Sequence, residues 1–321
     1  MHYRSVAQLS DQVWSWSQKL PKDIDLVVGI PRSGLLAANL VALYRNLPLT
    51  DVDGLLEGRV IANGSRRLHA PLADLARPLN VLVVDDSVCK GRAMQEVKER
   101  IAAAGLPHRM LYGAVYVRPG QEQQVDFYAE LLEIPRLFEW NFMHHKNRTG
   151  RVCMDIDGVL CGDPPREAND DGPRYSDFLA CAEPLHVPTE KVAWLVTCRL
   201  EKYRQATEEW LARHGIQYGE LIMMDLPDQD ARRAAGSHSA YKADVYRRTN
   251  ADLFYESSLS QAIQIANLAL KPVFCVDTRQ MIYPGSVPQT RLTIAQPPTN
   301  GRLAKAARRR VRRVLSRLGI L

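Results

Sequence analysis

The stretch VLVVDDSVCKGR, residues 81–92, decides the fold of the first part of the chain. Its four leading residues are apolar and suit a strand covered on both faces, as in a parallel α/β sheet. Residues 93–104 then carry helix formers with apolar residues at helical spacing. The sequence therefore predicts a buried strand that stops at Val84, a short loop and a helix.

The predicted loop has the composition of a ligand-binding site. Open α/β sheets hold ligands where strands end and helices begin, and free backbone N–H groups there favour a phosphate. Lys90 and Arg92 add positive charge, and Gly91 lets the backbone approach closely. Asp85 and Asp86 would repel a phosphate, so we expect them to bind sugar hydroxyls or a hydrated Mg²⁺ ion.

A phosphate at one end and a diol at the other describe a ribose 5-phosphate. The segment resembles the phosphoribosyl-pyrophosphate (PRPP) signature of type I phosphoribosyltransferases, although most members have Thr-Gly where this chain has Lys90-Gly91. The resemblance implies a PRPP site with Mg²⁺ held at Asp85 and Asp86. Its residues would be Asp85, Asp86, Ser87, Val88, Cys89, Lys90, Gly91 and Arg92. Taken alone, these residues also fit an ordinary strand with an acidic turn.

A second anion-binding geometry is predicted upstream, where residues 25–30 form a strand and residues 35–44 a helix. The loop between them contains Arg32, Ser33 and Gly34, and the resemblance implies that it binds the pyrophosphate of PRPP. Residues 51–80 resemble the mobile hood of that family, and a solvated loop is the alternative. Residues 1–20 are expected to form an amphipathic helix.

A second α/β unit begins at RVCMDIDGVL, residues 151–160. Its apolar strand ends in Asp155 and Asp157, and alternation along a strand puts residues two apart on the same side. Both acids are therefore expected to converge on one reacting atom. This segment resembles the first motif of haloacid-dehalogenase-type (HAD) phosphatases, which implies that Asp155 attacks phosphorus and Asp157 handles a proton.

Later motifs of the HAD family follow in order. Thr197 ends a predicted strand and would hydrogen-bond phosphoryl oxygens, Lys242 would offset negative charge, and Glu256 would hold Mg²⁺ together with Asp155 and Asp157. Many members have two acids where this chain has only Glu256. Residues 163–188 would form a small cap. Each residue also has a plain reading: a helix cap for Thr197, surface charge for Lys242 and a helix-start acid for Glu256.

The 321 residues exceed the usual size of one domain. We expect an α/β protein with two three-layer parallel-sheet domains, a phosphoribosyltransferase-like one at 1–135 and a HAD-like one at 151–285. Linkers are expected at 136–150 and 286–300. We expect no signal peptide at the start of the chain, and the six cysteines suit free thiols in the cytoplasm.

The tail 301–321 carries eight Arg and Lys residues and no acid, so removing these charges from the net charge of +6 leaves −2 on residues 1–300. Apolar residues recur in it at three- and four-residue steps: Leu303, Ala307, Val311, Val314, Leu315 and Leu318. A basic amphipathic helix of this kind suits an anionic membrane surface. Nucleic acid is the rival partner, but the tail lacks aromatic residues for stacking.

The order of the two motif sets resembles bifunctional ribofuranosyltransferases of bacterial surface polysaccharide assembly. The resemblance implies transfer of 5-phosphoribose from PRPP to a glycan carried on a lipid, followed by removal of the 5-phosphate, at the cytoplasmic face of the inner membrane. One alternative is a nucleobase phosphoribosyltransferase with nucleotidase activity. The other is a regulator that senses PRPP. The sequence does not predict an oligomeric state.

Overall fold

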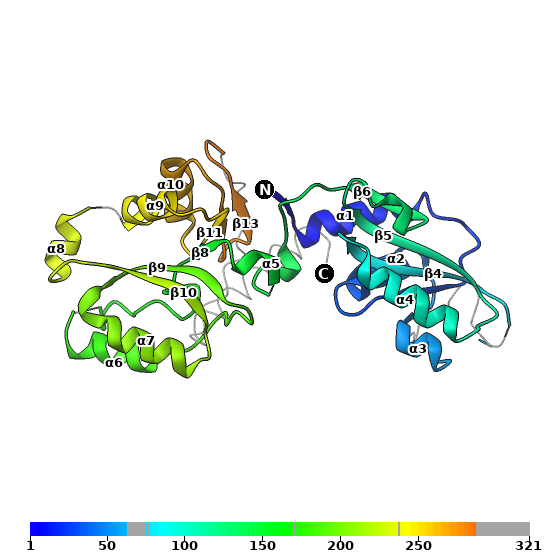
Figure 1. Ribbon diagram of the computed structural model, residues 1–321, viewed down its shortest axis with the longest axis horizontal. Coiled ribbons are helices and arrows are strands. Elements are labelled where there is room, and N and C mark those ends of the chain that lie inside the picture. Colours follow the sequence, from blue (N-terminus) through cyan, green and yellow to red (C-terminus); the bar gives the residue numbers. More distant parts are fainter. Residues whose placement is uncertain (63–74, 76, 145, 170, 237, 287–321) are drawn as a thin grey trace, which may run out of the picture. The chain divides into compact units, whose positions relative to one another are not determined.

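The computed structural model describes residues 1–62, 75, 77–144, 146–169, 171–236 and 238–286 (Figure 1). The described residues between 1 and 286 belong to one compact unit. The predicted tail helix, and the linker before it apart from Ser286, lie outside the described residues. The fold is α/β, with the described strands in sheets of five, six and two. The domain boundaries given above stay a prediction.

The five-stranded sheet is parallel throughout and has the order β3-β2-β4-β5-β6. Its strands are β2 (Leu26–Gly29), β3 (Leu49–Asp51), β4 (Asn80–Val88), β5 (Arg109–Val117) and β6 (Phe127–Leu131). Its helices are α1 (Val6–Ser17), α2 (Gly34–Arg45), α3 (Val52–Leu56) and α4 (Arg92–Ala103). A short 3₁₀ turn, Glu122–Gln124, precedes β6.

Strand β4 lies in the middle of this sheet and is buried on both faces, as its apolar run predicts. Leu82 and Val84 pack with α1 and α2, whereas Val81 and Val83 pack with α3 and α4. All four side chains are fully buried. The predicted three-layer arrangement is therefore present around this sheet.

The structure differs from the prediction at the end of β4. The strand does not stop at Val84 but continues through the two acids to Val88, because Asp85, Ser87 and Val88 pair with the long neighbouring strand β5. Asp85 and Asp86 are consequently strand residues. The loop that follows is limited to residues 89–91.

The six-stranded sheet has the order β10-β9-β8-β11-β12-β13, and all neighbours are parallel except β12 and β13. Its strands are β8 (Val152–Met154), β9 (Val192–Leu200), β10 (Tyr218–Met224), β11 (Leu253–Glu256), β12 (Val273–Cys275) and β13 (Gln280–Ile282). Its helices are α6 (Pro173–Cys181), α7 (Arg204–Arg213), α8 (Gln229–Ala234), α9 (His238–Arg248) and α10 (Leu259–Ala269). A 3₁₀ turn, Glu201–Tyr203, leads into α7.

This sheet also separates two cores. Trp210 of α7 packs on one face with Met154 and Leu195, whereas Tyr246 of α9 and Ile265 of α10 pack on the other. Figure 1 shows α6 and α7 on one side of the sheet and α9 and α10 on the other. The stretch expected to form a small cap contains α6, which packs beside α7.

The two-stranded sheet was not predicted. It pairs β1 (His2–Arg4) with β7 (Arg136–Phe138) in parallel. Helix α1 accordingly begins at Val6, where Ser5 and Gln8 form a capping box. The expectation of one helix over residues 1–20 was therefore wrong at its start. The predicted linker holds β7, a 3₁₀ turn at Glu139–Asn141 and α5 (Lys146–Thr149).

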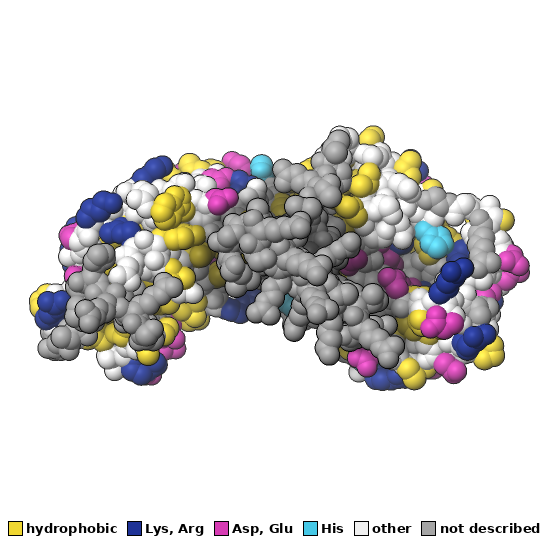
Figure 2. Space-filling model, turned by 180° about the vertical axis from the view of Figure 1, so that it is seen from behind, with side chains coloured by type: hydrophobic (Ala, Val, Ile, Leu, Met, Phe, Trp, Pro, Cys, Tyr) yellow, Lys and Arg dark blue, Asp and Glu magenta, His cyan; other side chains and the backbone are white. Residues whose placement is uncertain are grey.

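The region expected to act as a hood is structured at its start, where β3 and α3 lie. Residues 63–74 and 76 fall outside the described residues, so the closing of this segment stays a prediction. No helix among the described residues is long and apolar enough to cross a membrane. On the face drawn in Figure 2, basic and acidic side chains of the described residues are interspersed rather than sorted by sign.

Candidate active sites

The first candidate site is a cavity of about 520 Å³ at the end of β4. It is lined by Asp85 and by residues 87–94, which include the loop 89–91 and the start of α4. Gly91 precedes α4 with φ of 74°, a backbone conformation that favours glycine. The cavity thus brings together every predicted PRPP residue of this segment except Asp86.

Asp85 and Asp86 are both buried but have different partners. The Asp85 Oδ1 atom accepts a hydrogen bond from the Asp86 backbone N–H at 2.8 Å. Burial, followed by the nearby charge of Asp86, raises the pKa of Asp85 well above its ordinary value. Asp86 instead accepts hydrogen bonds from Ser33 Oγ at 3.0 Å and from Trp140 Nε1 at 2.8 Å. The donors around Asp86 are therefore neutral groups.

The loop between β2 and α2 lies against the same acids. Gly34 packs so closely on β4 that a Cβ atom there would lie 2.8 Å from the carbonyl oxygen of Val84. The Pro31–Arg32 peptide bond is cis. Arg32 is exposed, and its Nη2 donates to Asn141 Oδ1 at 3.2 Å. None of the three predicted loop residues, Arg32, Ser33 and Gly34, lines the cavity, but Ser33 contacts Asp86 directly.

Trp140 and Asn141 contact residues of the first site, and the sequence did not predict these contacts. Both lie on the turn Glu139–Asn141, and one bonds Asp86 while the other bonds Arg32. Trp140 stacks on Phe138 with ring centroids 4.8 Å apart. The only sequence signal was the cluster of aromatic residues, which suggested packing rather than a contact with Asp86.

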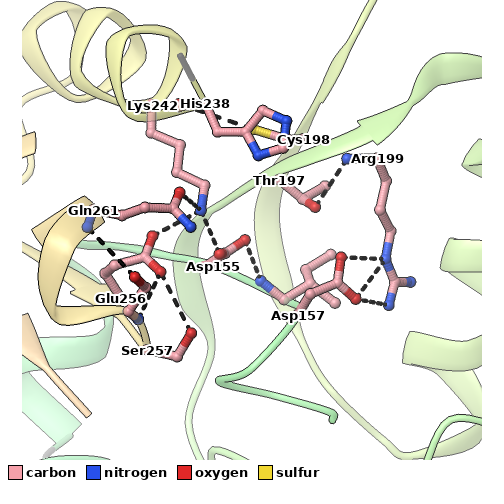
Figure 3. Close-up of polar contacts among 12 residues, drawn as sticks. Asp155, Asp157, Thr197, Cys198, Arg199, His238, Lys242, Glu256, Ser257 and Gln261 are labelled. Atoms are coloured by element: carbon pink, nitrogen blue, oxygen red, sulfur yellow. Dashed lines mark hydrogen bonds and ion pairs between the residues drawn. The ribbon is translucent and has the colours of Figure 1, made fainter. Parts of the chain in front are cut away.

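The second candidate site is built around Asp155, directly after β8 (Figure 3). Lys242 Nζ lies 2.5 Å from Asp155 Oδ2 and 2.7 Å from Glu256 Oε2, and all three side chains are buried. Burial raises the pKa of Asp155 to about 7, against the opposing effect of Lys242. Burial alone would lower the pKa of Lys242, but the two carboxylates raise it instead. The ammonium group thus links the predicted nucleophile to the predicted metal ligand.

Asp157 points away from Asp155 toward Arg199 in Figure 3. Arg199 Nη2 lies 2.6 Å from Asp157 Oδ1, and Arg199 Nε lies 3.2 Å from both carboxylate oxygens. Arg199 is buried, and although burial opposes its charge, Asp157 raises its pKa above the ordinary value. The two acids therefore contact different cations in this structure, rather than one common point.

Thr197 is fully buried within β9, and its hydroxyl oxygen accepts a hydrogen bond from the backbone N–H of Arg199 at 3.2 Å. The adjacent cavity has a volume of about 140 Å³. Of the predicted residues, Asp155, Asp157 and Lys242 line it, whereas Thr197 and Glu256 do not. Its remaining lining residues were not predicted: Asp163, Pro164, Asn169, Tyr175, Cys198, Arg232, His238 and Gln261.

The acids do not form a metal-ligand group as they stand. Within the part of the chain that the structure describes, no three His, Cys, Asp or Glu side chains are arranged to hold a metal ion. In the second site, Lys242 occupies the position between Asp155 and Glu256, and Arg199 pairs with Asp157. Binding of Mg²⁺ at the five predicted acids stays a prediction.

Comparison with known proteins places similarity in part of the chain. No protein-family model matches it. The amidophosphoribosyltransferase of Synechocystis sp. is 25% identical over 160 residues, which are 42% of this chain and 32% of that protein. The enzyme of the same name from Synechococcus elongatus is 26% identical over 101 residues, or 28% of this chain and 20% of that protein. The chain thus spans about a fifth to a third of the length of these curated relatives.

Similar solved structures include a purine phosphoribosyltransferase from Pyrococcus horikoshii, with 21% identity and a TM-score of 0.32, covering 43% of this chain and 92% of that one. Another is the xanthine-guanine-hypoxanthine phosphoribosyltransferase of Helicobacter pylori, with 12% identity and a TM-score of 0.33, again over 43% and 92% of the two chains. In less than half of its length, the chain is similar to phosphoribosyltransferases.

Proposed function

We propose that the chain is a bifunctional enzyme that transfers 5-phosphoribose from PRPP to a glycan acceptor and then removes the 5-phosphate, leaving ribofuranose. The observation that carries the proposal is the first cavity. Asp85 faces a loop that contains Lys90, Gly91 and Arg92 at the start of a helix. An acid for sugar hydroxyls and a loop suited to a phosphate therefore line the same cavity.

In the transfer step, the loop 89–91 and the first turn of α4 would bind the 5-phosphate through backbone N–H groups and the side chains of Lys90 and Arg92. Asp85 would bind ribose hydroxyls, with Asp86 held behind it by Ser33 and Trp140. The loop at Arg32 would stabilise the departing pyrophosphate. Mg²⁺ bound with PRPP would offset the negative charge of the pyrophosphate.

In the second step, the Asp155 carboxylate would attack phosphorus as the bond from phosphorus to the sugar oxygen breaks. Asp157 would give its proton to that oxygen and then take one from the water that hydrolyses the aspartyl-phosphate. Lys242 would stabilise the phosphoryl oxygens while it holds Asp155 in place. Asp157 points away from Asp155 here, so for these proton transfers one of its carboxylate oxygens would turn toward Asp155 while the other keeps its contact with Arg199, which orients the acid.

We propose further that the glycan acceptor is lipid-linked and that the tail 301–321 docks on an anionic membrane surface at the cytoplasmic face. The basis is the sequence of the tail, with eight cations and a periodic apolar stripe. Deletion of residues 301–321 should leave turnover of water-soluble acceptors unchanged and lower co-sedimentation with anionic vesicles. Equal vesicle binding by full-length and truncated protein would exclude this role, and tight binding of RNA at physiological salt would favour the nucleic-acid alternative.

The test of the main proposal is incubation of the chain with PRPP and two groups of acceptors, synthetic or lipid-linked glycans and free nucleobases. In Asp155→Asn, transfer should continue and a product should accumulate that is heavier by one phosphate, about 80 mass units, because only hydrolysis needs the nucleophile. Replacing both Asp85 and Asp86 with Asn should abolish transfer but leave hydrolysis of a supplied phosphosugar. Persistence of dephosphorylated product in Asp155→Asn would refute the phosphatase assignment, and transfer to nucleobases alone would favour the nucleotide alternative.

A further inference from the structure

Arg232, on helix α8, lines the second cavity together with Asp155 and Lys242. Its side chain is 9% exposed, and no sequence motif pointed to it. Buried arginines in proteins are usually paired with acids, because an unpaired buried charge is costly. The contacts of Arg232 therefore decide whether its charge is compensated within the protein.

The guanidinium group of Arg232 bonds only neutral oxygens among the described residues. Its Nη1 donates to the carbonyl oxygen of Cys198 at 3.2 Å, and its Nη2 donates to Asn169 Oδ1 at 3.3 Å. Its Nε is buried and has no hydrogen-bond partner among the described residues. A buried donor of this kind in a polar cavity needs an acceptor from outside the described residues, which a water molecule or a bound ligand can supply.

Two other described cations at or beside the cavity are already neutralised. Lys242 contacts Asp155 and Glu256, and Arg199 contacts Asp157. Burial and the charges of Arg232 and Lys242 lower the pKa of His238, so this lining residue adds no positive charge near neutral pH. Arg232 is thus the cation of the described lining whose charge is available to an anion.

The position and size of the cavity indicate which anion fits. Arg232 is anchored to Cys198, the residue after Thr197, at the end of β9 where Asp155 also lies. The volume of about 140 Å³ is well below the roughly 300–1,000 Å³ of sites that enclose a whole drug-sized ligand. A phosphoryl group therefore fits inside while the rest of the substrate stays outside.

We propose that Arg232 binds the phosphoryl group of the substrate, its guanidinium donating to non-bridging oxygens of a phosphate monoester while Asp155 faces the phosphorus. This inference rests on the proposed phosphatase step and names a residue that selects for the doubly charged monoester. An arginine suits this role because its planar fork binds phosphate oxygens in pairs.

The test compares Arg232→Gln with Arg45→Gln in the full chain. Arg45 is a matched control because it also bonds backbone carbonyls, those of Ser17 and Pro21, but belongs to the first sheet. All proteins, including the reference, carry Lys90→Ala and Arg92→Ala, so that phosphate does not bind the first loop. Binding of inorganic phosphate is measured by calorimetry, and the KM and kcat for a phosphate monoester by phosphate release.

We expect Arg232→Gln to weaken phosphate binding and to raise KM by at least about tenfold, the loss of one charged phosphate contact, while Arg45→Gln changes neither. Equal phosphate affinity in the two variants would overturn the proposal and leave Arg232 as a clamp on Cys198. If Arg232→Gln does not fold, Arg232→Lys decides, since a lysine cannot reproduce the paired geometry and an unchanged KM would contradict the role. Loss of phosphate binding in Arg232→Gln, in a chain that hydrolyses no monoester, would support the anion site and refute only the phosphatase step.

Discussion

The two pairs of aspartates look alike in sequence and are treated differently by the fold. Asp85 and Asp86 are adjacent in β4, and their partners are a backbone N–H, a hydroxyl and an indole N–H. Asp155 and Asp157 follow β8, and each contacts a buried cation. The first pair thus forms no direct ion pair among the described residues, although buried Arg136 interacts with both acids at longer range, whereas each acid of the second pair contacts a cation of the protein. This difference is in line with the two proposed ligands, ribose hydroxyls at the first site and a phosphoryl group at the second.

The largest expected effect follows from removing the cation of the second pair. In Lys242→Met, Asp155 and Glu256 would be buried side by side without compensation, so the free energy of unfolding should fall by about 3–5 kcal/mol. Chemical denaturation followed by circular dichroism measures this loss. Arg247→Gln, which breaks only an exposed pair with Asp244, is the control and should cost less than about 1 kcal/mol. A similar small loss in both variants would mean that Lys242 does not neutralise Asp155 and Glu256.

Removing the cation of Asp157 tests whether this pairing serves the chemistry. Arg199→Gln should lower the kcat of phosphate release by about 10- to 100-fold, because the proton-transferring acid is no longer oriented. Transfer from PRPP, measured in the same preparation, should not change. Arg199→Lys keeps the charge and should recover part of the rate. An unchanged kcat in Arg199→Gln would show that Arg199 has a structural role alone.

For the first pair, the corresponding change is Trp140→Phe, which removes the indole donor to Asp86 and keeps an aromatic ring for stacking on Phe138. A hydrogen bond to a charged group contributes about 1.5 kcal/mol or more, so PRPP affinity should weaken by roughly tenfold. Trp14→Phe is the matched control, since Trp14 is exposed and packs only on Tyr44 among described aromatic residues. Calorimetric titration with PRPP compares them, and equal affinities would contradict a role for Trp140 at Asp86.

The smallest effect is expected at the opposite end of β8 and β11. There, a hydrogen bond from Arg151 lowers the pKa of Asp252. A lowered pKa means that this pair stabilises the fold at neutral pH. The contribution begins to fall as the pH drops below the ordinary pKa of an aspartate near 4, and it is gone only below the lowered pKa. Because Arg151 is exposed and Asp252 is half-buried, Asp252→Asn should lower Tm at pH 7 by no more than about 2 °C and by less at pH 3. Scanning calorimetry at both pH values checks this, and a loss of Tm at pH 3 equal to that at pH 7 would exclude the electrostatic cause.

Local sequence pattern predicted the elements whose own residues form a continuous or periodic apolar pattern. The apolar runs of β2, β4 and β8 and the helices α2 and α4 were placed to within a few residues, since burial on both faces leaves a continuous hydrophobic signal. The three-residue strands β1 and β7 were missed because such short strands carry no periodicity. The extension of β4 through its acids depends on β5, more than 20 residues away, which local pattern does not report.

The same distinction holds at the sites. The acids of the two motifs and the loop after β4 could be identified from the sequence because the residues of each motif lie next to one another in the chain. Arg199 and Arg232 could not, since the first meets an acid 42 residues away and the second is placed by its bonds to Cys198 and Asn169. The partners of buried charges depend on which strands become neighbours in the sheet. Local sequence pattern does not predict that order, so it does not predict the partners.

The hydrogen bond from Trp140 to Asp86 makes the first site observable by tryptophan fluorescence. Indole emission responds to the electric field along its ring, and here the ring N–H ends on a buried carboxylate. A cation or a ribose hydroxyl that binds Asp86 will change that field and shift the fluorescence of Trp140. The emission of Trp210 should stay constant, because it packs in the second sheet and its N–H donates to the carbonyl oxygen of Ala182. Subtracting the spectrum of Trp140→Phe would isolate this emission and follow occupancy of the first site in real time, without a label or a turnover assay.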